Sequence, residues 1–362
     1  MSPDSPATFR NLLEPPALAE LFIQHPPQGF TCRMDTLGLP VFSTTFDLLT
    51  TLESGARRRL TSLPLFSAWS RLLRMRTCFV GTTLTEYAPL PQNLSPETVI
   101  NNLLAEHGQG QTLTIVKDLP DRSPLLPKED NDFADALAAL AVNKGFIAVG
   151  GQALAHVRID FADIGEYLGR LSAGRRKDMR RKLRKRPELA VEILSIGEPR
   201  FFDFVFLDQL YAMYLAVFAQ SEIHFDLLSR EFFATLLQRH DIEGVVFLYW
   251  HEKTNAKRLA GYNICLIENK MLIDKYVGFT YPLARELNLY FISWMYNLEF
   301  ALERGLHTYI AGWTDPQVKA SLGASFTFTR HLVWVRNPLL RSILRPLRPF
   351  FESDGQVVRG AA

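Results

Sequence analysis

Asp274 has the surroundings that most favour chemistry. It lies inside the apolar segment Met271 to Phe279, which is typical of a strand. A carboxylate without a partner in such surroundings is costly to ionise, so its pKa should rise toward values useful for proton transfer. Alternation along the strand places it on one face with Tyr276 and Gly278. The alternative is a carboxylate at the rim of a sheet, paired with a neighbouring lysine.

Asp315 is a second candidate for acid–base chemistry, although an Asp before Pro316 is also an ordinary helix cap. Lys319, in the short helix that follows, could contact a phosphate or a carboxylate, or could lie in solvent. Arg285, at the start of another predicted helix, could pair with a phosphate while the helix N-terminus supplies amides. Its alternative partner is Glu286 or another surface carboxylate.

The segment Arg175 to Arg186 is the densest charge run of the chain. Arg176, Arg180 and Arg184 share one helical face and could grip a phosphate of a donor or of an acceptor. The neighbouring face continues an apolar stripe, which predicts a helix docked on a domain and not a flexible tail. The stripe comprises Ile164, Leu168, Leu171, Met179 and Leu183. The basic face could also join two halves of the protein.

Motif searches exclude several enzyme classes. The chain has no Gly-x-Ser-x-Gly elbow, no Gly-Lys-Ser/Thr phosphate loop and no Gly-x-Gly-x-x-Gly, which argues against hydrolases, NTPases and dinucleotide enzymes. The histidines show no spacing typical of metal ligands, so we expect no metal site. They include His224, His240, His251, His307 and His331. A net charge of +2 argues against nucleic-acid binding as the main function.

Composition and the termini predict a cytoplasmic protein. Three widely spaced cysteines indicate reduced core residues, namely Cys32, Cys78 and Cys265. The first 14 residues are not typical of a secretory signal. Phe201 to Gln220 is the most apolar stretch, but it carries polar residues and predicts a buried helix and not a membrane span.

The tail from Trp334 to Phe351 alternates leucine and isoleucine with arginine. This pattern resembles a short interfacial anchor, so peripheral membrane contact through residues 336–351, on the inner face of the membrane, is one interpretation. Pro346 and Pro349 limit the helix. The alternative is that the leucine face packs on the domain.

The predicted elements indicate an α/β (α+β) protein with a mixed, mostly antiparallel sheet flanked by helices. In the second half the order is strand, two helices, three strands, long helix, strand, short helix, strand. That order resembles the GCN5-related N-acetyltransferase (GNAT) fold, and the first half repeats part of it, which predicts tandem GNAT-like domains. We expect an irregular leader at 1–30, a degenerate GNAT-like domain at 31–158, a GNAT/Fem-like domain at 159–335 and a basic amphipathic tail at 336–362.

Two stretches resemble the Fem-like and BioF2-like acyltransferases, relatives of the peptidoglycan-bridge enzymes. The first is the basic helix, in which Ser172, Arg176, Arg180 and Arg181 are the matching positions. The second runs from Tyr276-Val-Gly-Phe to Lys319-Ala-Ser-Leu-Gly-Ala. Together they cover roughly residues 160 to 335. The family often carries Asn where this chain has Asp178.

The resemblance implies transfer of an acyl group from acyl-CoA, as co-substrate, onto an amine of a small molecule or cell-envelope precursor. It implies that strands four and five splay apart beside the donor, which gives a cleft between 276–285 and 312–319. The catalytic candidates are then Asp274, Tyr276 and Asp315. The donor-binding candidates are Arg176, Arg180, Gly278, Arg285 and Lys319. The usual Gly-rich phosphate loop of acetyltransferases is absent from the sequence after Gly278.

Two alternatives remain open at this point. One is an aminoacyl-tRNA-dependent Fem-type transferase, although such enzymes often carry a long helical hairpin and residues 202–240 predict two ordinary helices. The other is a binding module for nucleic acid or membrane that uses the basic helix 175–186. We expect an acyltransferase for groups other than aminoacyl groups.

Overall fold

The computed structural model describes residues 9–350 except for 48, 50–60, 63–65, 67–69, 222–224 and 254–255. His224, the predicted turn at 254–255 and the tail beyond 350 therefore lie outside the described residues. The chain forms two compact units: unit 1 contains 1–12, 18–153 and 327–362, and unit 2 contains 13–17 and 154–326. Two of the boundaries between the units lie at 153/154 and 326/327. The domain limits predicted from the sequence, at 158/159 and 335/336, stay predictions.

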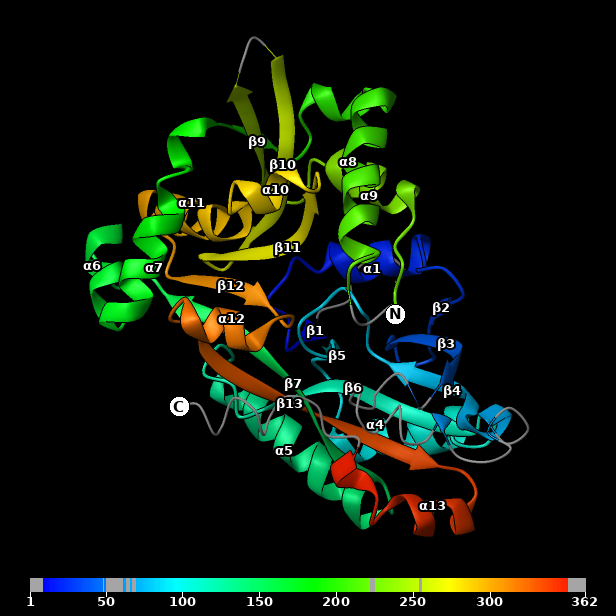
Figure 1. Cartoon of the computed structure of the whole chain (residues 1–362). Helices are drawn as coiled ribbons and strands as arrows, with labels where there is room; N and C mark the ends of the chain where they lie inside the picture. Colours follow the sequence, from blue (N-terminus) through cyan, green and yellow to red (C-terminus); the bar gives the residue numbers. More distant parts are fainter. Residues whose placement is uncertain are drawn as a thin grey trace. The chain divides into compact units, whose positions relative to one another are not determined.

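Unit 1 contains a mixed sheet in the order β2-β3-β4-β6-β13-β7 (Figure 1). Its neighbours pair antiparallel between β2 and β3, β3 and β4, and β6 and β13, and parallel between β4 and β6. The strands are β2 (Thr31–Met34), β3 (Pro40–Asp47), β4 (Arg74–Val80), β6 (Leu113–Asp121), β7 (Ile147–Arg158) and β13 (Ser325–Val335). A small separate pair joins β1 (Phe9–Arg10) to β5 (Leu90–Pro91).

The helices of unit 1 form where the sequence carries start signals. The Ser95 side chain accepts a hydrogen bond from the Thr98 N–H, and Pro96 begins α4 (Pro96–Asn102), as its sequence predicts. The remaining helical segments are α1 (Ala17–Gln24), a π-helix (Leu103–His107), α5 (Lys128–Asn143) and α13 (Pro338–Leu344). The leader expected to be irregular thus contains α1.

Unit 2 contains a mostly antiparallel sheet in the order β7-β12-β11-β10-β9-β8, flanked by helices (Figure 1). The strands are β8 (Leu189–Ser195), β9 (Gly244–Lys253), β10 (Ala256–Glu268), β11 (Met271–Phe279) and β12 (Thr308–Gly312). The helices are α6 (Ile164–Arg170), α7 (Ala173–Leu183), α8 (Phe204–Phe218), α9 (Arg230–Leu237), α10 (Leu283–Glu286), α11 (Leu289–Glu303) and α12 (Pro316–Ser321). This architecture confirms the predicted fold class.

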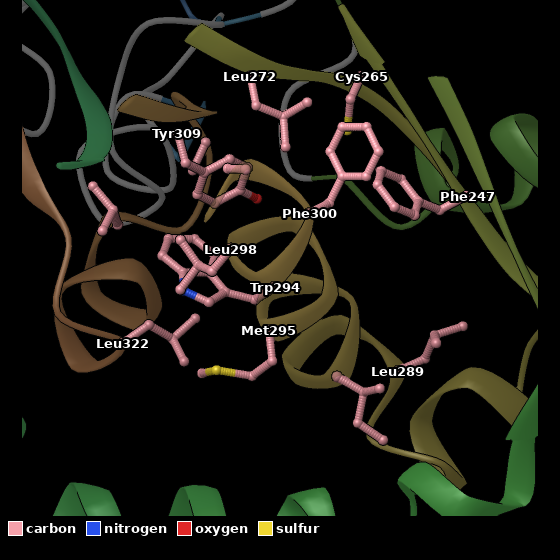
Figure 2. Packing of buried hydrophobic residues seen from close by; sticks show 14 of the residues in the cluster. Phe247, Cys265, Leu272, Leu289, Trp294, Met295, Leu298, Phe300, Tyr309 and Leu322 are labelled. Atoms are coloured by element: carbon pink, nitrogen blue, oxygen red, sulfur yellow. The ribbon is translucent and has the colours of Figure 1, made fainter. Parts of the chain in front are cut away.

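The core of unit 2 forms around α11. Figure 2 shows Trp294, Leu298 and Phe300 on this helix among buried side chains of the sheet, with the Tyr309 ring close to Trp294. The centroids of these two rings are 5.1 Å apart, in an edge-on arrangement. Burying large rings in this geometry favours a single packing of helix on sheet.

The basic segment forms α7, docked as its apolar stripe predicts. Ser172 caps the helix by accepting from the Arg175 N–H, and Met179 is buried with Leu168 and Leu171 in the core of unit 2. Leu183 packs on the same core. The stripe is interrupted once, because α6 ends at Arg170 before α7 begins.

The helix expected over Phe201 to Gln220 forms as α8, and it is buried on one face only. Phe206, Leu207 and Leu210 of α8 are buried, but the first turn exposes Phe204 and Val205. Apolar side chains lie on the face of α8 that packs on the sheet and also on its exposed face. The length and mean hydropathy of the stretch do not show which of these side chains are buried.

Strands β11 and β12 splay apart, as the resemblance implies. Their parallel pairing runs from Met271 with Thr308 to Ile273 with Ile310, and it stops before Asp274 although β11 continues to Phe279. The separation places Asp274 at the point where the two strands diverge.

Candidate active site

A β-bulge decides which way Asp274 points. Along the β10–β11 pair, Ile264 lies opposite Tyr276 and Cys265 lies opposite Asp274, so Lys275 has no partner on β10. A single extra residue in one strand breaks the alternation of side chains at that place. Asp274 therefore turns toward α11.

Tyr276 and Gly278 lie on the opposite face, so the expectation that they share a face with Asp274 is wrong. The Tyr276 ring packs on Phe232 and Phe233 of α9. A Cβ atom at Gly278 would come within 2.1 Å of the Tyr262 ring, which explains the glycine by close packing. Their predicted roles in catalysis and donor binding remain predictions, but neither lines the cavity described below.

Asn263, Asn297 and Tyr309 hold the Asp274 carboxylate through hydrogen bonds, and the Cys265 thiol adds a weaker one to Oδ1 at 3.7 Å. Asn263 on β10 donates from Nδ2 to both carboxylate oxygens, at 3.0 and 2.8 Å. Asn297 Nδ2 on α11 and the Tyr309 hydroxyl on β12 each donate to Oδ2 at 2.9 Å. The donors come from three elements, which fixes the carboxylate in one orientation.

Burial raises the pKa of Asp274, while hydrogen bonds from Asn263 and Tyr309 and the charge of Lys319 oppose the rise. Asp274 is partly buried by its own surface area, and its carboxylate is largely screened from water by the neighbouring side chains. A raised pKa is what proton uptake near neutral pH requires, as the sequence predicts.

Lys319 is buried, with 3% of its surface exposed, and its Nζ donates to the Ala311 carbonyl at 2.6 Å. The solvated alternative for Lys319 is therefore wrong. The short helix α12, which begins with Pro316, carries this side chain back toward the end of β12. A buried ammonium so close to a carboxylate supplies positive charge where little water can screen it.

Asp274 and Lys319 line one small cavity of about 20 Å³, which is room for about one water molecule. Its other walls are Asn263, Val277, Tyr290, Ser293, Trp294, Tyr309 and Ala311. Within the part of the chain that the structure describes, Asn263 Oδ1, Asn297 Oδ1 and the Tyr290 hydroxyl have no hydrogen-bond partner. Unsatisfied polar groups at a cavity favour a polar occupant with hydrogen-bond donors.

Asp315 does not join this arrangement. It is exposed at the start of α12, its backbone is left-handed with φ of 52°, and its side chain makes no capping hydrogen bond. The ordinary side-chain cap is therefore wrong for this residue. The acid–base role predicted for Asp315 stays a prediction, without support from the cavity lining.

The predicted phosphate contacts of the basic helix have different surroundings. Arg176 donates to the carbonyls of Gly169 and Leu171 at 3.0 and 3.3 Å, and so holds the end of α6. Arg180 is exposed and, with Lys177 and Arg184, forms no hydrogen bond or ion pair through its side chain among the described residues. The roles predicted for Arg176 and Arg180 in donor binding stay predictions, and this second set has its cationic groups exposed.

Arg285 is exposed on α10. Its guanidinium bonds to the Gln220 side chain and lies 5.0 Å above the Tyr281 ring. The carboxylate partner expected for Arg285 is replaced by an amide and an aromatic face.

Asn263, Asn297 and Tyr309 are the site residues that the sequence analysis missed. Each lies within a stretch of apolar residues, where a buried polar side chain signals a partner elsewhere. That signal indicates that the side chain is hydrogen-bonded, but it does not identify the partner. Here the partner is Asp274, which lies 11 to 35 positions away in the sequence.

Within the described residues, Asp35, Glu106 and His107 form a group that could hold a metal ion. The His107 Nε2 atom lies 3.4 Å from Asp35 Oδ2 and 3.8 Å from Glu106 Oε1. Asn102 donates to Asp35, and Thr36 and Arg33 contact Glu106, so the cluster is already hydrogen-bonded. The expectation of no metal stays a prediction, since histidine spacing alone could not detect this group.

Comparison with known proteins relates this fold to proteins of the Fem type. The family model that matches residues 131–355 is FemAB-like, described as peptidoglycan biosynthesis/recognition. The chain belongs to the FemAB-like family, which confirms the resemblance found in the sequence. No curated protein matches the chain in a sequence search.

Three solved structures share the fold. The C-terminal domain of a putative lysylphosphatidylglycerol synthetase from Agrobacterium fabrum is 11% identical, with a TM-score of 0.53 over 87% of this chain and 86% of that chain. L-PGS from Bacillus licheniformis is 11% identical, with a TM-score of 0.52 over 95% of this chain and 98% of that chain. FemX is 12% identical, with a TM-score of 0.52 over 91% of this chain and 98% of that chain.

The expectation of a transferase for groups other than aminoacyl groups is wrong. FemX and lysylphosphatidylglycerol synthetase are aminoacyl transferases, which is the class that this expectation excluded. None of the helices within the described ranges is both long and apolar enough to cross a lipid bilayer.

Proposed function

We propose that the protein is an aminoacyltransferase that moves an aminoacyl group from the ester of an aminoacyl-tRNA to an amine of a cell-envelope precursor. The observation that carries the proposal is the shared cavity of Asp274 and Lys319, at the point where β11 and β12 diverge. Membership of the FemAB-like family supports the envelope acceptor.

Asp274 acts as the base. The acceptor amine attacks the ester carbonyl, so that a carbon–nitrogen bond forms, the carbon–oxygen ester bond breaks, and the amine proton passes to the Asp274 carboxylate. The same proton then goes to the departing ribose oxygen, which leaves as a hydroxyl. The hydrogen bonds from Asn263 and Tyr309 hold the carboxylate in position, and its raised pKa suits both steps.

Lys319 stabilises the negative charge that develops on the carbonyl oxygen. Its ammonium is held at the cavity by the Ala311 carbonyl and is screened by little water. A preorganised cation in such surroundings stabilises a developing oxyanion more than the same charge would in water.

The size of the cavity limits what enters beside Asp274. Room for about one water molecule admits an amino group but not a ring or a branched side chain. The unsatisfied Asn263 Oδ1 can accept a hydrogen bond from that amine.

The exposed set Lys177, Arg180 and Arg184 on α7 supplies contacts for tRNA phosphates. The three residues recur at helical spacing on one face and carry no carboxylate partner in the described residues. Because α8 and α9 are ordinary helices and not a long hairpin, α7 is the element to which we assign these contacts.

A transfer assay tests the proposal. Purified protein is incubated with a mixture of radiolabelled aminoacyl-tRNAs and a pool of peptidoglycan precursors, and parallel reactions receive acetyl-CoA or long-chain acyl-CoA as donor. We expect label in the precursor from aminoacyl-tRNA only, and its loss in Asp274→Asn. Transfer from acyl-CoA alone would overturn the donor assignment, and transfer from neither donor would overturn the proposal.

A further inference from the structure

Helix α13 and the turn after it expose an apolar stripe on unit 1. Leu339, Ile343 and Leu347 are 76%, 60% and 38% exposed, and their spacing of four places them on one side of the helix. Leu340 and Leu344 are partly buried on the other side. The sequence analysis left open that the leucine face packs on the domain. Among these five apolar side chains, only Leu340 and Leu344 do so.

The same segment carries positive charge without negative charge. Residues 336–350 contain four arginines and no aspartate or glutamate, the arginines being Arg336, Arg341, Arg345 and Arg348. None of them forms an ion pair with any residue that the structure describes. The cationic surface is left for an external anionic partner.

The segment is held in a defined orientation. The Asn337 side chain accepts from the Leu339 and Leu340 N–H groups at 2.9 and 3.2 Å and so caps α13. The Arg341 guanidinium lies 3.8 Å above the Trp334 ring and donates to the Val335 carbonyl. These contacts anchor the helix, which follows β13 in the chain (Figure 1), while the stripe stays exposed.

We propose that α13 docks this surface on an anionic lipid bilayer, with Leu339 and Ile343 at the boundary between headgroups and acyl chains and Arg345 and Arg348 beside lipid phosphates. An apolar stripe flanked by arginines is what an interfacial helix requires. A nucleic acid would satisfy the arginines but offers no apolar surface for the stripe. This surface brings the protein to lipid-linked acceptors, and it does not depend on the chemistry proposed for Asp274.

Vesicle sedimentation of the full chain tests this inference. The protein is mixed with vesicles of phosphatidylcholine alone or with 30% phosphatidylglycerol, at low and high salt. We expect binding to the anionic vesicles only, weakened by salt. Leu339→Ser with Ile343→Ser should lower the partition coefficient at least about ten-fold. Arg345→Gln with Arg348→Gln should lower it about 25-fold, since each basic residue near the surface contributes about five-fold.

Ile193→Ser is the matched control, because Ile193 is 48% exposed on β8 of unit 2 and should leave binding unchanged. Thermal unfolding of each variant checks that the fold is retained. If the Leu339→Ser, Ile343→Ser variant unfolds, the Arg345→Gln, Arg348→Gln variant still tests membrane binding, because both arginines are exposed. Equal binding to both vesicle types, or anionic binding that survives both double variants, would overturn the inference. Loss of tRNA binding in the arginine variants with unchanged vesicle binding would assign the surface to nucleic acid instead.

Discussion

Asn263 donates hydrogen bonds to both oxygens of Asp274 from the neighbouring strand, and this pair exists only because of the bulge between β10 and β11. In register, Asn263 lies opposite Val277 and not opposite Asp274. The extra residue, Lys275, brings Asp274 back onto the Asn263 face, toward α11. One extra residue in β11 thus converts a strand carboxylate into the centre of a polar site.

Asp274→Asn should abolish transfer while the protein stays folded. The variant keeps the shape and most hydrogen-bond capacity of the side chain but cannot accept the amine proton, so we expect a rate loss of about 100-fold or more. Single-turnover rates measure it. Turnover within three-fold of the parent would remove Asp274 as the base.

The same variant should not be less stable at neutral pH. Burial raises the folded-state pKa of Asp274, so its favourable contribution is present below the unfolded pKa and is lost as pH rises through the folded pKa. Burial makes the Asp274 carboxyl costly to ionise, whereas asparagine carries no charge at any pH. Thermal unfolding should show an equal or higher midpoint for Asp274→Asn, and a fall of several degrees would contradict the predicted sign.

Tyr309→Phe should move the acid limb of the pH–rate profile to higher pH. The hydroxyl stabilises the ionised carboxylate by donating to Oδ2, so its removal raises the Asp274 pKa further. Tyr249→Phe is the matched control, because the Tyr249 hydroxyl is buried without a hydrogen-bond partner in the described chain. Identical shifts in both variants would show that Tyr309 has no specific role.

Lys319→Met should lower the transfer rate by about 100-fold with a smaller change in KM. Methionine fills similar space but carries no charge, and the loss of one preorganised donor typically has this size. The assay is steady-state kinetics with the preferred donor. Recovery of activity in Lys319→Arg would support the charge, whereas a purely structural lysine predicts a lower Tm and an unchanged kcat.

His107 should make stability depend on pH in unit 1. Burial lowers its pKa, but hydrogen bonds to Asp35 and Cys78 outweigh burial and raise the pKa to about 9. The stabilisation is present below the unfolded value and is lost as pH rises through about 9. Urea unfolding of the parent should weaken between pH 6 and pH 10, on the order of 3 kcal/mol. His107→Gln should lack this dependence, and parallel curves would contradict it.

The order of elements in unit 2 could be predicted from sequence because each carries a local signal. The basic helix shows this well, since Met179 and Leu183 at helical spacing predict a docked face. The apolar segment of β11 likewise predicts a strand with an enclosed Asp274. The periodicity of apolar residues and the capping of helices depend on a few neighbouring residues, so the sequence alone determines them.

What surrounds Asp274 was decided by tertiary structure. The bulge depends on how β10 and β11 pair, and alternation within β11 predicts the wrong companions, Tyr276 and Gly278. Asn297 and Tyr309 reach the carboxylate from α11 and β12. The Arg176 guanidinium donates to two backbone carbonyls, which its spacing on the helix did not indicate. The sequence by itself determined the elements, the docked basic helix and the family, because those rest on local patterns. Only the folded chain determined the site, because its hydrogen bonds join residues that no short window contains.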